Sequence, residues 1–185
     1  LLTALSRLSS DLWIRVLYGH PDRTDDRLIR SMANNPGVLP YFDLPVQHAS
    51  AGVLKRMGRH YDCDCLLRLF DKIRDMVPEA VLRTTLIVGF PGETRKDFEE
   101  LAKFVEKVRF DHLGVFVYSD EEDLPSHRLS GHVAVKTAKK RRDAIMKIQK
   151  AISEKNNEKY IGRTLDVLVE EIPENGVLAG RTWFQ

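Results

Sequence analysis

The sequence has few cysteines, no long apolar run and no marked excess of charge of either sign. Its 185 residues include only Cys63 and Cys65, which excludes a disulfide-stapled secreted scaffold and favours a cytoplasmic protein. No apolar run approaches the roughly 20 residues that a membrane-spanning helix needs, so no membrane partner is expected. The 29 basic and 27 acidic residues give a net charge of +2, which is too balanced to predict nucleic-acid binding from composition.

Metal ligands are equally scarce. A zinc or iron–sulfur site takes about four protein ligands, and two cysteines with scattered histidines fall short of that number. The C-x-C spacing of Cys63 and Cys65 at the start of a helical pattern also keeps them off a common helix face. We therefore expect these cysteines to be structural, and we predict no metal site in this chain.

Strands and helices alternate along the first two thirds of the chain. Apolar, strand-like runs occupy residues 12–18, 39–47, 80–90 and 112–119. Helical patterns occupy residues 24–34, 51–57, 62–76 and 94–108, and Ser50 is the expected cap of the second. This alternation predicts an α/β fold with a parallel sheet. The nearly continuous apolar strands predict a sheet covered on both faces.

The pattern changes after Ser119. A polar loop leads into a long helix over residues 133–160, and two strand-like segments follow, joined through the hairpin signal "PENG". We expect an α/β unit over residues 1–130, a linker helix over 131–160 and the start of a small β domain over 161–185. The chain begins at Leu1 inside a helical pattern, so we expect a piece of a longer protein. Four β/α units belong to either a doubly wound sheet or an incomplete barrel.

The loop "GFPGE" after the third strand is the first candidate site. Gly89 and Gly92 allow a ligand to approach the backbone, and Glu93 and Thr94 open the next helix. The loop lacks the Lys-Ser/Thr of a phosphate-binding loop, and its acidic residue suits a ribose hydroxyl or an ammonium group. A purely structural turn is an equally good interpretation of the same residues.

Other polar residues follow or interrupt the strands. Gln47 and His48 end the second strand, where a histidine is more often structural than catalytic. Arg83 sits inside an apolar strand and needs a partner, and a structural ion pair with Asp43 is a strong alternative to a ligand. The basic run 136–150 is typical of a solvated helix face, although contact with RNA is a second interpretation.

Several segments, in order, resemble the radical S-adenosylmethionine methylthiotransferases. They are "LPYFDLPVQHAS", "VLRTTLIVGFPGET", "GVFVYSDEED" and "RTLDVLVEE…GRTW", and the "QH" and "YSDEE" pieces are most similar to the branch that modifies a ribosomal protein. The resemblance implies the C-terminal portion of an incomplete (β/α)6 radical-SAM barrel, a linker helix and the start of a small β-barrel (TRAM) domain. It also implies that S-adenosylmethionine is held along the third strand and its loop by Ile87, Gly89, Phe90 and Glu93. From barrel geometry we expect Gln47, Arg83 and Tyr118, at neighbouring strand ends, to line the same pocket.

The C-x-x-x-C-x-x-C motif that binds the family's catalytic [4Fe–4S] cluster is absent, so the resemblance implies cluster ligands outside this chain. After "YSDEE", Asp123 and Leu124 replace the Gly-Thr of many relatives. The implied reaction begins with reductive cleavage of S-adenosylmethionine and places a methylthio group on the β-carbon of an aspartate in a small-subunit ribosomal protein. We expect this chain alone to be inactive, and an RNA contact through the TRAM-like domain.

Three alternatives stay open. The first is the related branch that modifies adenosine in tRNA by the same chemistry. The second is a non-catalytic module that binds RNA or the ribosome. The third is an unrelated α/β enzyme that binds a nucleotide at "GFPGE".

Overall fold

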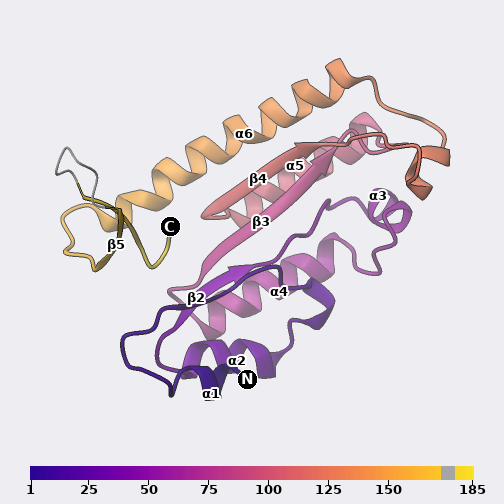
Figure 1. The fold of residues 1–185 in the computed structure, drawn as a ribbon. Coiled ribbons are helices and arrows are strands. Elements are labelled where there is room, and N and C mark those ends of the chain that lie inside the picture. Colours follow the sequence, from indigo (N-terminus) through magenta and orange to yellow (C-terminus); the bar gives the residue numbers. More distant parts are fainter. Residues whose placement is uncertain (172–177) are drawn as a thin grey trace.

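A computed structural model describes residues 1–171 and 178–185. Its central sheet has the order β1-β2-β3-β4, and all neighbouring strands are parallel. The strands are β1 (Ile14–Val16), β2 (Val38–Asp43), β3 (Val81–Val88) and β4 (His112–Val117), as Figure 1 shows. The parallel sheet predicted from the sequence is confirmed, with shorter strands. Spatial order follows chain order without reversal, as it does along the wall of a barrel, whereas a doubly wound sheet reverses its order.

The helices begin close to their predicted starts. They are α1 (Leu2–Leu5), α2 (Asp26–Asn34), α3 (Ala51–Arg56), α4 (Cys63–Met76), α5 (Arg95–Val108) and α6 (Val135–Asn157), with 3-10 turns η1 (Pro21–Arg23), η2 (Pro125–Arg128) and η3 (Glu158–Tyr160). Thr94 caps α5 in a reciprocal capping box with Asp97. Ser50 stands at the predicted N-cap of α3, but its side chain accepts no hydrogen bond from that helix, and its hydroxyl donates to Asp97 at 2.5 Å.

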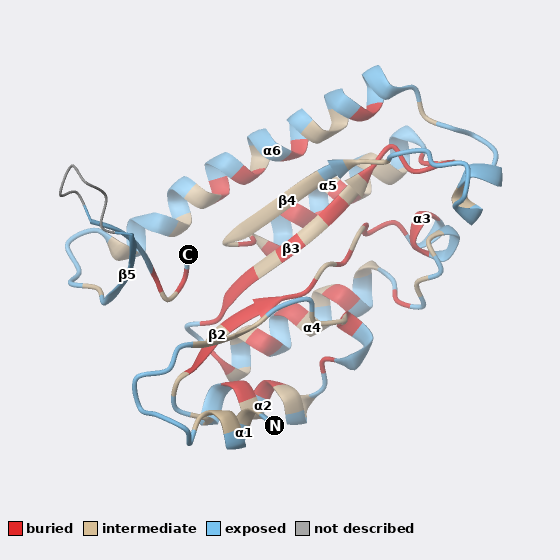
Figure 2. Ribbon diagram, viewed as in Figure 1, coloured by how far each residue is buried: buried red, intermediate tan, exposed pale blue. Residues whose placement is uncertain are grey.

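The hydrophobic core lies between one face of the sheet and helices α2, α4 and α5. Alternate residues of β3 point into it, and Leu82, Leu86 and Val88 are fully buried. Phe70 of α4 meets Phe110 edge-on, with ring centroids 5.0 Å apart. Each such side chain contributes about 1.5–3 kcal/mol through burial. Helix α6 extends this layer along β4 (Figures 1 and 2).

The opposite face of the sheet is largely open, so the expectation of two covered faces is wrong. Arg83, Thr85 and Ile87 of β3 point to this face and are only half-buried, and Phe116 of β4 is 63% exposed. In a barrel, helices pack outside the strands while the inner face closes against other strands. The apolar residues of these strands therefore suit a barrel interior and not a second helical layer.

A hairpin covers only the amino-terminal end of the open face. Its strands β5 (Val167–Glu171) and β6 (Ala179–Thr182) are antiparallel, as predicted, and the predicted turn "PENG" lies outside the described residues. Phe184 packs with Leu39, Tyr41 and Val81 of the sheet. Its ring stacks on Tyr160 at 3.8 Å. Within residues 1–171 and 178–185, no helix is long and apolar enough to cross a membrane.

Candidate site at the carboxyl edge of the sheet

The "GFPGE" loop leaves β3 with two glycines in the left-handed region. Gly89 has φ +81° and Gly92 has φ +78°. A Cβ at Gly89 would collide with Ala138 of α6, and a Cβ at Gly92 would lie 2.9 Å from the guanidinium carbon of Arg56. Backbone conformation thus favours glycine at both positions, and packing against α6 also requires it at Gly89, whereas the guanidinium near Gly92 ends a flexible side chain. The structural interpretation of this turn explains them without a ligand.

Glu93 folds back into the loop that precedes it. Its side chain is completely buried, and its Oε2 accepts hydrogen bonds from the N–H of Gly89 and, at 3.2 Å, from the N–H of Phe90. A buried carboxylate that accepts backbone N–H groups fixes their positions strongly. Glu93 therefore shapes the loop, and its carboxylate does not point to solvent where a ribose hydroxyl would lie.

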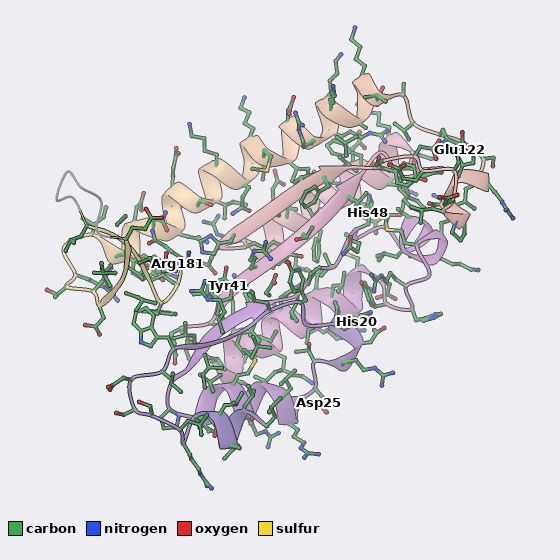
Figure 3. All side chains as sticks on the ribbon, viewed as in Figure 1. His20, Asp25, Tyr41, His48, Glu122 and Arg181 are labelled. Atoms are coloured by element: carbon green, nitrogen blue, oxygen red, sulfur yellow. The ribbon has the colours of Figure 1, made fainter. Side chains whose placement is uncertain are left out.

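The side chains of Arg141 and His48 lie beside the Glu93 carboxylate. Arg141 of α6 places Nη1 3.1 Å from Oε1 of Glu93 and donates to the backbone oxygen of Glu93 at 3.2 Å. His48 Nε2 lies 4.0 Å from the same Oε1, and His48 Nδ1 accepts from the N–H of Ser50 at 2.9 Å. His48 is fully buried between β3 and α3 (Figure 3), which matches its structural interpretation.

Arg141 is a member of this site that sequence reasoning missed. It lies in the basic run 136–150, where its neighbours Lys139 and Lys140 are exposed. Its side chain is only 12% exposed. The helical period of α6 offered a signal, because Arg141 lies three residues after Ala138 and four before Ile145, on the face that the structure buries.

Gln47 and Ile87 line a pocket beside the loop. Gln47 has φ +69° although it is not a glycine, and this conformation is held by two backbone hydrogen bonds to β3. Its N–H donates to Thr85 O at 3.0 Å and its O accepts from Ile87 N–H at 2.7 Å. The pocket measures about 330 Å³, and Phe90, Arg56 and Arg59 also line it. A strained residue in a pocket is typical of functional sites.

Tyr118 lies at the rim of the same pocket. Its ring meets the Phe90 ring at 5.1 Å and 72°, and its hydroxyl hydrogen-bonds Ser126, a lining residue, at 2.9 Å. The hydroxyl also donates to Asp120 at 3.2 Å. Burial raises the pKa of Asp120, but the hydrogen bond and charge of His127 outweigh burial and hold this pKa below its ordinary value. Tyr118 thus joins the pocket to the loop after β4.

Arg83 lies apart from this pocket, so its expected grouping with Gln47 and Tyr118 is wrong. It is the third residue of β3, whereas Ile87 is the seventh. Its Nη1 lies 2.6 Å from Asp43 Oδ1, which confirms the ion pair considered from the sequence. The other five predicted residues, Gln47, Ile87, Gly89, Phe90 and Tyr118, gather around the carboxyl edge, and Glu93 lies buried beneath them.

The cysteines form no part of the site. Cys63 is half-buried, and burial, followed by the negative charges of Glu100 and Asp64, raises the pKa of its thiol. Cys65 is exposed and accepts a hydrogen bond from Arg68 at 3.2 Å. Within the described part of the chain, no three His, Cys, Asp or Glu side chains are placed to hold a metal ion together.

Residues 2–105 match the family described as the Radical SAM superfamily. The chain belongs to the radical SAM superfamily. This assignment covers the sheet from β1 to β3, the "GFPGE" loop and most of α5. It agrees with the barrel-wall topology.

Proteins named "Ribosomal protein uS12 methylthiotransferase RimO" align with essentially the whole chain. The protein of Desulfosudis oleivorans is 55% identical over all 185 residues, and that of Clostridioides difficile is 46% identical over 98% of the chain. The resemblance seen in the sequence is thereby confirmed. The chain spans 42% and 41% of the lengths of these two relatives.

Two solved radical SAM structures share the fold. Coproporphyrinogen III oxidase (HemN) of Escherichia coli superposes with a TM-score of 0.62 at 18% identity, covering 88% of this chain and 38% of HemN. The methyltransferase TsrM of Kitasatospora setae gives 0.50 at 17% identity, covering 63% of this chain and 23% of TsrM. At these identities the likeness supports the α/β radical SAM fold and nothing finer.

Proposed function

We propose that this chain is the cofactor-holding part of a radical SAM methylthiotransferase that modifies an aspartate of ribosomal protein uS12. The observation that carries the proposal is the pocket of about 330 Å³ at the carboxyl edge, lined by Gln47, Ile87 and Phe90. Ligands of α/β barrels bind at this edge. The relatives named for uS12 methylthiotransfer match the chain through this region.

The lining of the pocket suits the adenosine part of S-adenosylmethionine. Ile87 and Phe90 offer an apolar and an aromatic surface for a purine ring. The Gln47 side chain adds donors and an acceptor, because its backbone groups are already paired with β3. Gly89 and Glu93 would act by fixing the loop, and Tyr118 by holding Phe90. S-adenosylmethionine would supply the hydrogen-abstracting and methyl groups of the reaction.

The residues present do not suit an iron–sulfur cluster. Cys63 and Cys65 lie at the start of α4, and neither joins two further ligands in the described residues. We propose that the [4Fe–4S] clusters are bound by parts of a longer protein, and that this chain alone cleaves no S-adenosylmethionine. What these residues contribute is the binding and orientation of the cofactor.

The remaining assignments follow from the same proposal. We divide the chain into a partial radical-SAM barrel (1–130), a linker helix (131–160) and the beginning of a TRAM-like β domain (161–185), to which the antiparallel pair β5 and β6 belongs. An RNA contact through this β domain and a cytoplasmic location complete the proposal. A protein of the small ribosomal subunit as substrate requires such a location.

Two experiments test the proposal at different levels. For the chain itself, calorimetric titration of S-adenosylmethionine is compared for wild type, Ile87→Glu and Ile161→Glu. We expect about tenfold weaker binding for Ile87→Glu, because it buries a carboxylate in the pocket, and no change for Ile161→Glu, whose side chain is 80% exposed elsewhere. Wild-type chain that binds no S-adenosylmethionine, or equal binding by both variants, would contradict the cofactor assignment.

For the reaction, a longer protein containing this chain is reconstituted with its clusters without oxygen and given reductant, S-adenosylmethionine and uS12. We expect 5′-deoxyadenosine and the mass gain of a methylthio group on uS12. Cofactor cleavage with methylthio transfer to tRNA and none to uS12 would assign the chain to the tRNA-modifying branch. A folded, cluster-loaded protein that cleaves nothing would overturn the radical chemistry.

A further inference from the structure

A second cavity lies at the other end of the open sheet face. It measures about 530 Å³, and its residues come from β1, β2, β3 and the hairpin of β5 and β6. Tyr41 of β2 forms part of its floor and Arg181 of β6 part of its roof (Figure 3). The cavity thus combines the inner face of the barrel wall with the β unit that follows α6.

Three guanidinium groups and two carboxylates line this cavity. Arg83 is 35% exposed and pairs through Nη1 with Asp43, whose side chain is 1% exposed. The other carboxylate oxygen of Asp43 accepts from the N–H of Tyr18 at 3.1 Å. Both oxygens of Asp43 are therefore occupied, and the remaining donors of Arg83 are held in a fixed orientation beside the cavity.

Arg15 is the cation without a carboxylate. Its guanidinium lies 4.1 Å from the ring centroid of Tyr41, and its Nη2 donates to the backbone oxygen of Trp183 at 2.9 Å. Among the described residues, no carboxylate lies within ion-pair distance of Arg15. At the roof, Arg181 pairs with Glu170 at 2.8 Å, and both side chains stay substantially exposed. The cavity therefore has one more positive than negative group.

We propose that this cavity binds the carboxylate side chain of a protein segment, with Arg15 and Arg83 as its donors. An aspartate or glutamate side chain offers one compact anion for the unmatched charge, and the neighbouring surfaces of Trp13, Leu39 and Tyr41 suit the apolar part of a peptide. A nucleic-acid backbone is less suitable, because only one cation of the cavity lacks a carboxylate partner, and a series of phosphates would need several.

The cavity lies on the same sheet face as the proposed cofactor pocket. Its role as a substrate site rests on the proposed function. Arg83 and Ile87 point to the same face of β3 and are four residues apart, about 13 Å along an extended strand. A side chain held by Arg83 would therefore face the same space as a cofactor held at Ile87. The hairpin would then select the protein substrate through the roof residue Arg181.

The two tryptophans of the sequence provide a direct readout. Trp13 lines the cavity and Trp183 contacts Arg15 through its backbone oxygen. Intrinsic fluorescence of the wild-type chain is titrated with N-acetyl-aspartate methylamide and, separately, with the isosteric N-acetyl-asparagine methylamide. We expect the aspartate probe to change the fluorescence with about tenfold tighter binding than the asparagine probe, since hydrogen bonds to charged groups are the stronger ones.

Variants locate the site. Arg15→Met, and the double variant Arg83→Met with Asp43→Asn, should each weaken binding of the aspartate probe about tenfold. The double variant removes the ion pair without leaving a buried charge unpaired. Arg142→Met, which removes an exposed arginine of α6 paired with its neighbour Asp143, is the matched control and should bind like wild type.

The outcomes separate this inference from the proposed function. Equal binding of the two probes, binding unchanged in Arg15→Met, or displacement of the aspartate probe by a short single-stranded RNA would each overturn the carboxylate site. If wild type binds S-adenosylmethionine but not the aspartate probe, this inference fails and the cofactor assignment stands. If it binds the aspartate probe but not S-adenosylmethionine, the carboxylate site is supported and the proposed function fails.

Discussion

The two ends of the open sheet face are built in different ways. At the carboxyl edge, Gly89, Phe90 and Glu93 are neighbours in sequence, and the Glu93 carboxylate accepts hydrogen bonds from the N–H groups of the other two. At the amino end, the cavity joins Arg15 to Trp183, residues 168 positions apart. The first region is a local loop in which Glu93 pairs with Arg141 of α6, whereas the second is a cavity that forms only when the hairpin packs on the sheet. From this comparison we expect the proposed cofactor pocket, but not the proposed substrate site, to survive loss of the hairpin.

The largest effect is expected from Glu93→Ala, which removes the carboxylate that holds the loop at the carboxyl edge. It leaves two buried N–H groups and the Arg141 guanidinium without their acceptor. We expect the free energy of unfolding to fall by about 4 kcal/mol, measured by urea denaturation. Glu99→Ala, on the exposed side of α5, is the control and should change stability by less than about 0.5 kcal/mol. Equal losses of unfolding free energy for both variants would mean that Glu93 does not stabilise the loop.

Phe184→Ala tests the other end. Phe184 is 7% exposed and connects the hairpin to Leu39, Tyr41 and Val81. We expect its truncation to cost about 3 kcal/mol, at the low end for a buried phenylalanine because the cluster is small. Measured by hydrogen exchange, protection should fall in β5 and β6 while the amides of Gln47 and Ile87 keep theirs.

Phe116→Ala serves as the control for Phe184→Ala. Phe116 lies on the same open face but is 63% exposed, so its truncation should leave hairpin protection unchanged. If protection at Gln47 fell together with that of the hairpin, the two ends would form one cooperative unit, contrary to the comparison.

The contrast between the two ends also explains how much the sequence could predict. The strands, the helices, the cap at Thr94 and the Arg83–Asp43 ion pair were predictable, because each depends on residue periodicity, on residues close in sequence or on neighbouring strands. The pocket at the carboxyl edge was predictable for the same reason, since parallel strands end at one edge.

What could not be predicted depends on distant contacts. The role of Arg141 requires knowing where α6 packs, because its partner Glu93 lies 48 residues away. Ser50 stands at the N-cap of α3, but its oxygen accepts no N–H of that helix, and its hydroxyl donates instead to Asp97, a residue of another helix. The second cavity has no signal in sequence, because β6 approaches Arg15 only in the folded chain.

Gly89→Ala should have an intermediate effect that separates backbone strain from packing. We expect a loss of about 2 kcal/mol, of which about 1 kcal/mol arises from the left-handed conformation and the rest from collision with Ala138. Gly58→Ala is the matched control, because Gly58 has φ +70° but nothing within 4 Å of an added Cβ. If the collision displaces the loop and so weakens S-adenosylmethionine binding in Gly89→Ala, adding Ala138→Gly should restore that binding.

The smallest effect is expected from Asp97→Asn, and it should depend on pH. Burial raises the pKa of Asp97, but hydrogen bonds from Ser50 and Thr94 outweigh burial, so the pKa in the folded protein lies below the usual value of 3.8. The carboxylate therefore stabilises the fold fully above that value, and its contribution is lost as the pH falls through the lower folded pKa. We expect Asp97→Asn to cost about 1 kcal/mol at neutral pH, measured by urea denaturation across the pH range, and the difference from wild type to shrink as the pH falls below 3.8. A difference that stays constant with pH would assign the effect to packing, and the α3–α5 contact through Ser50 would then lose its electrostatic explanation.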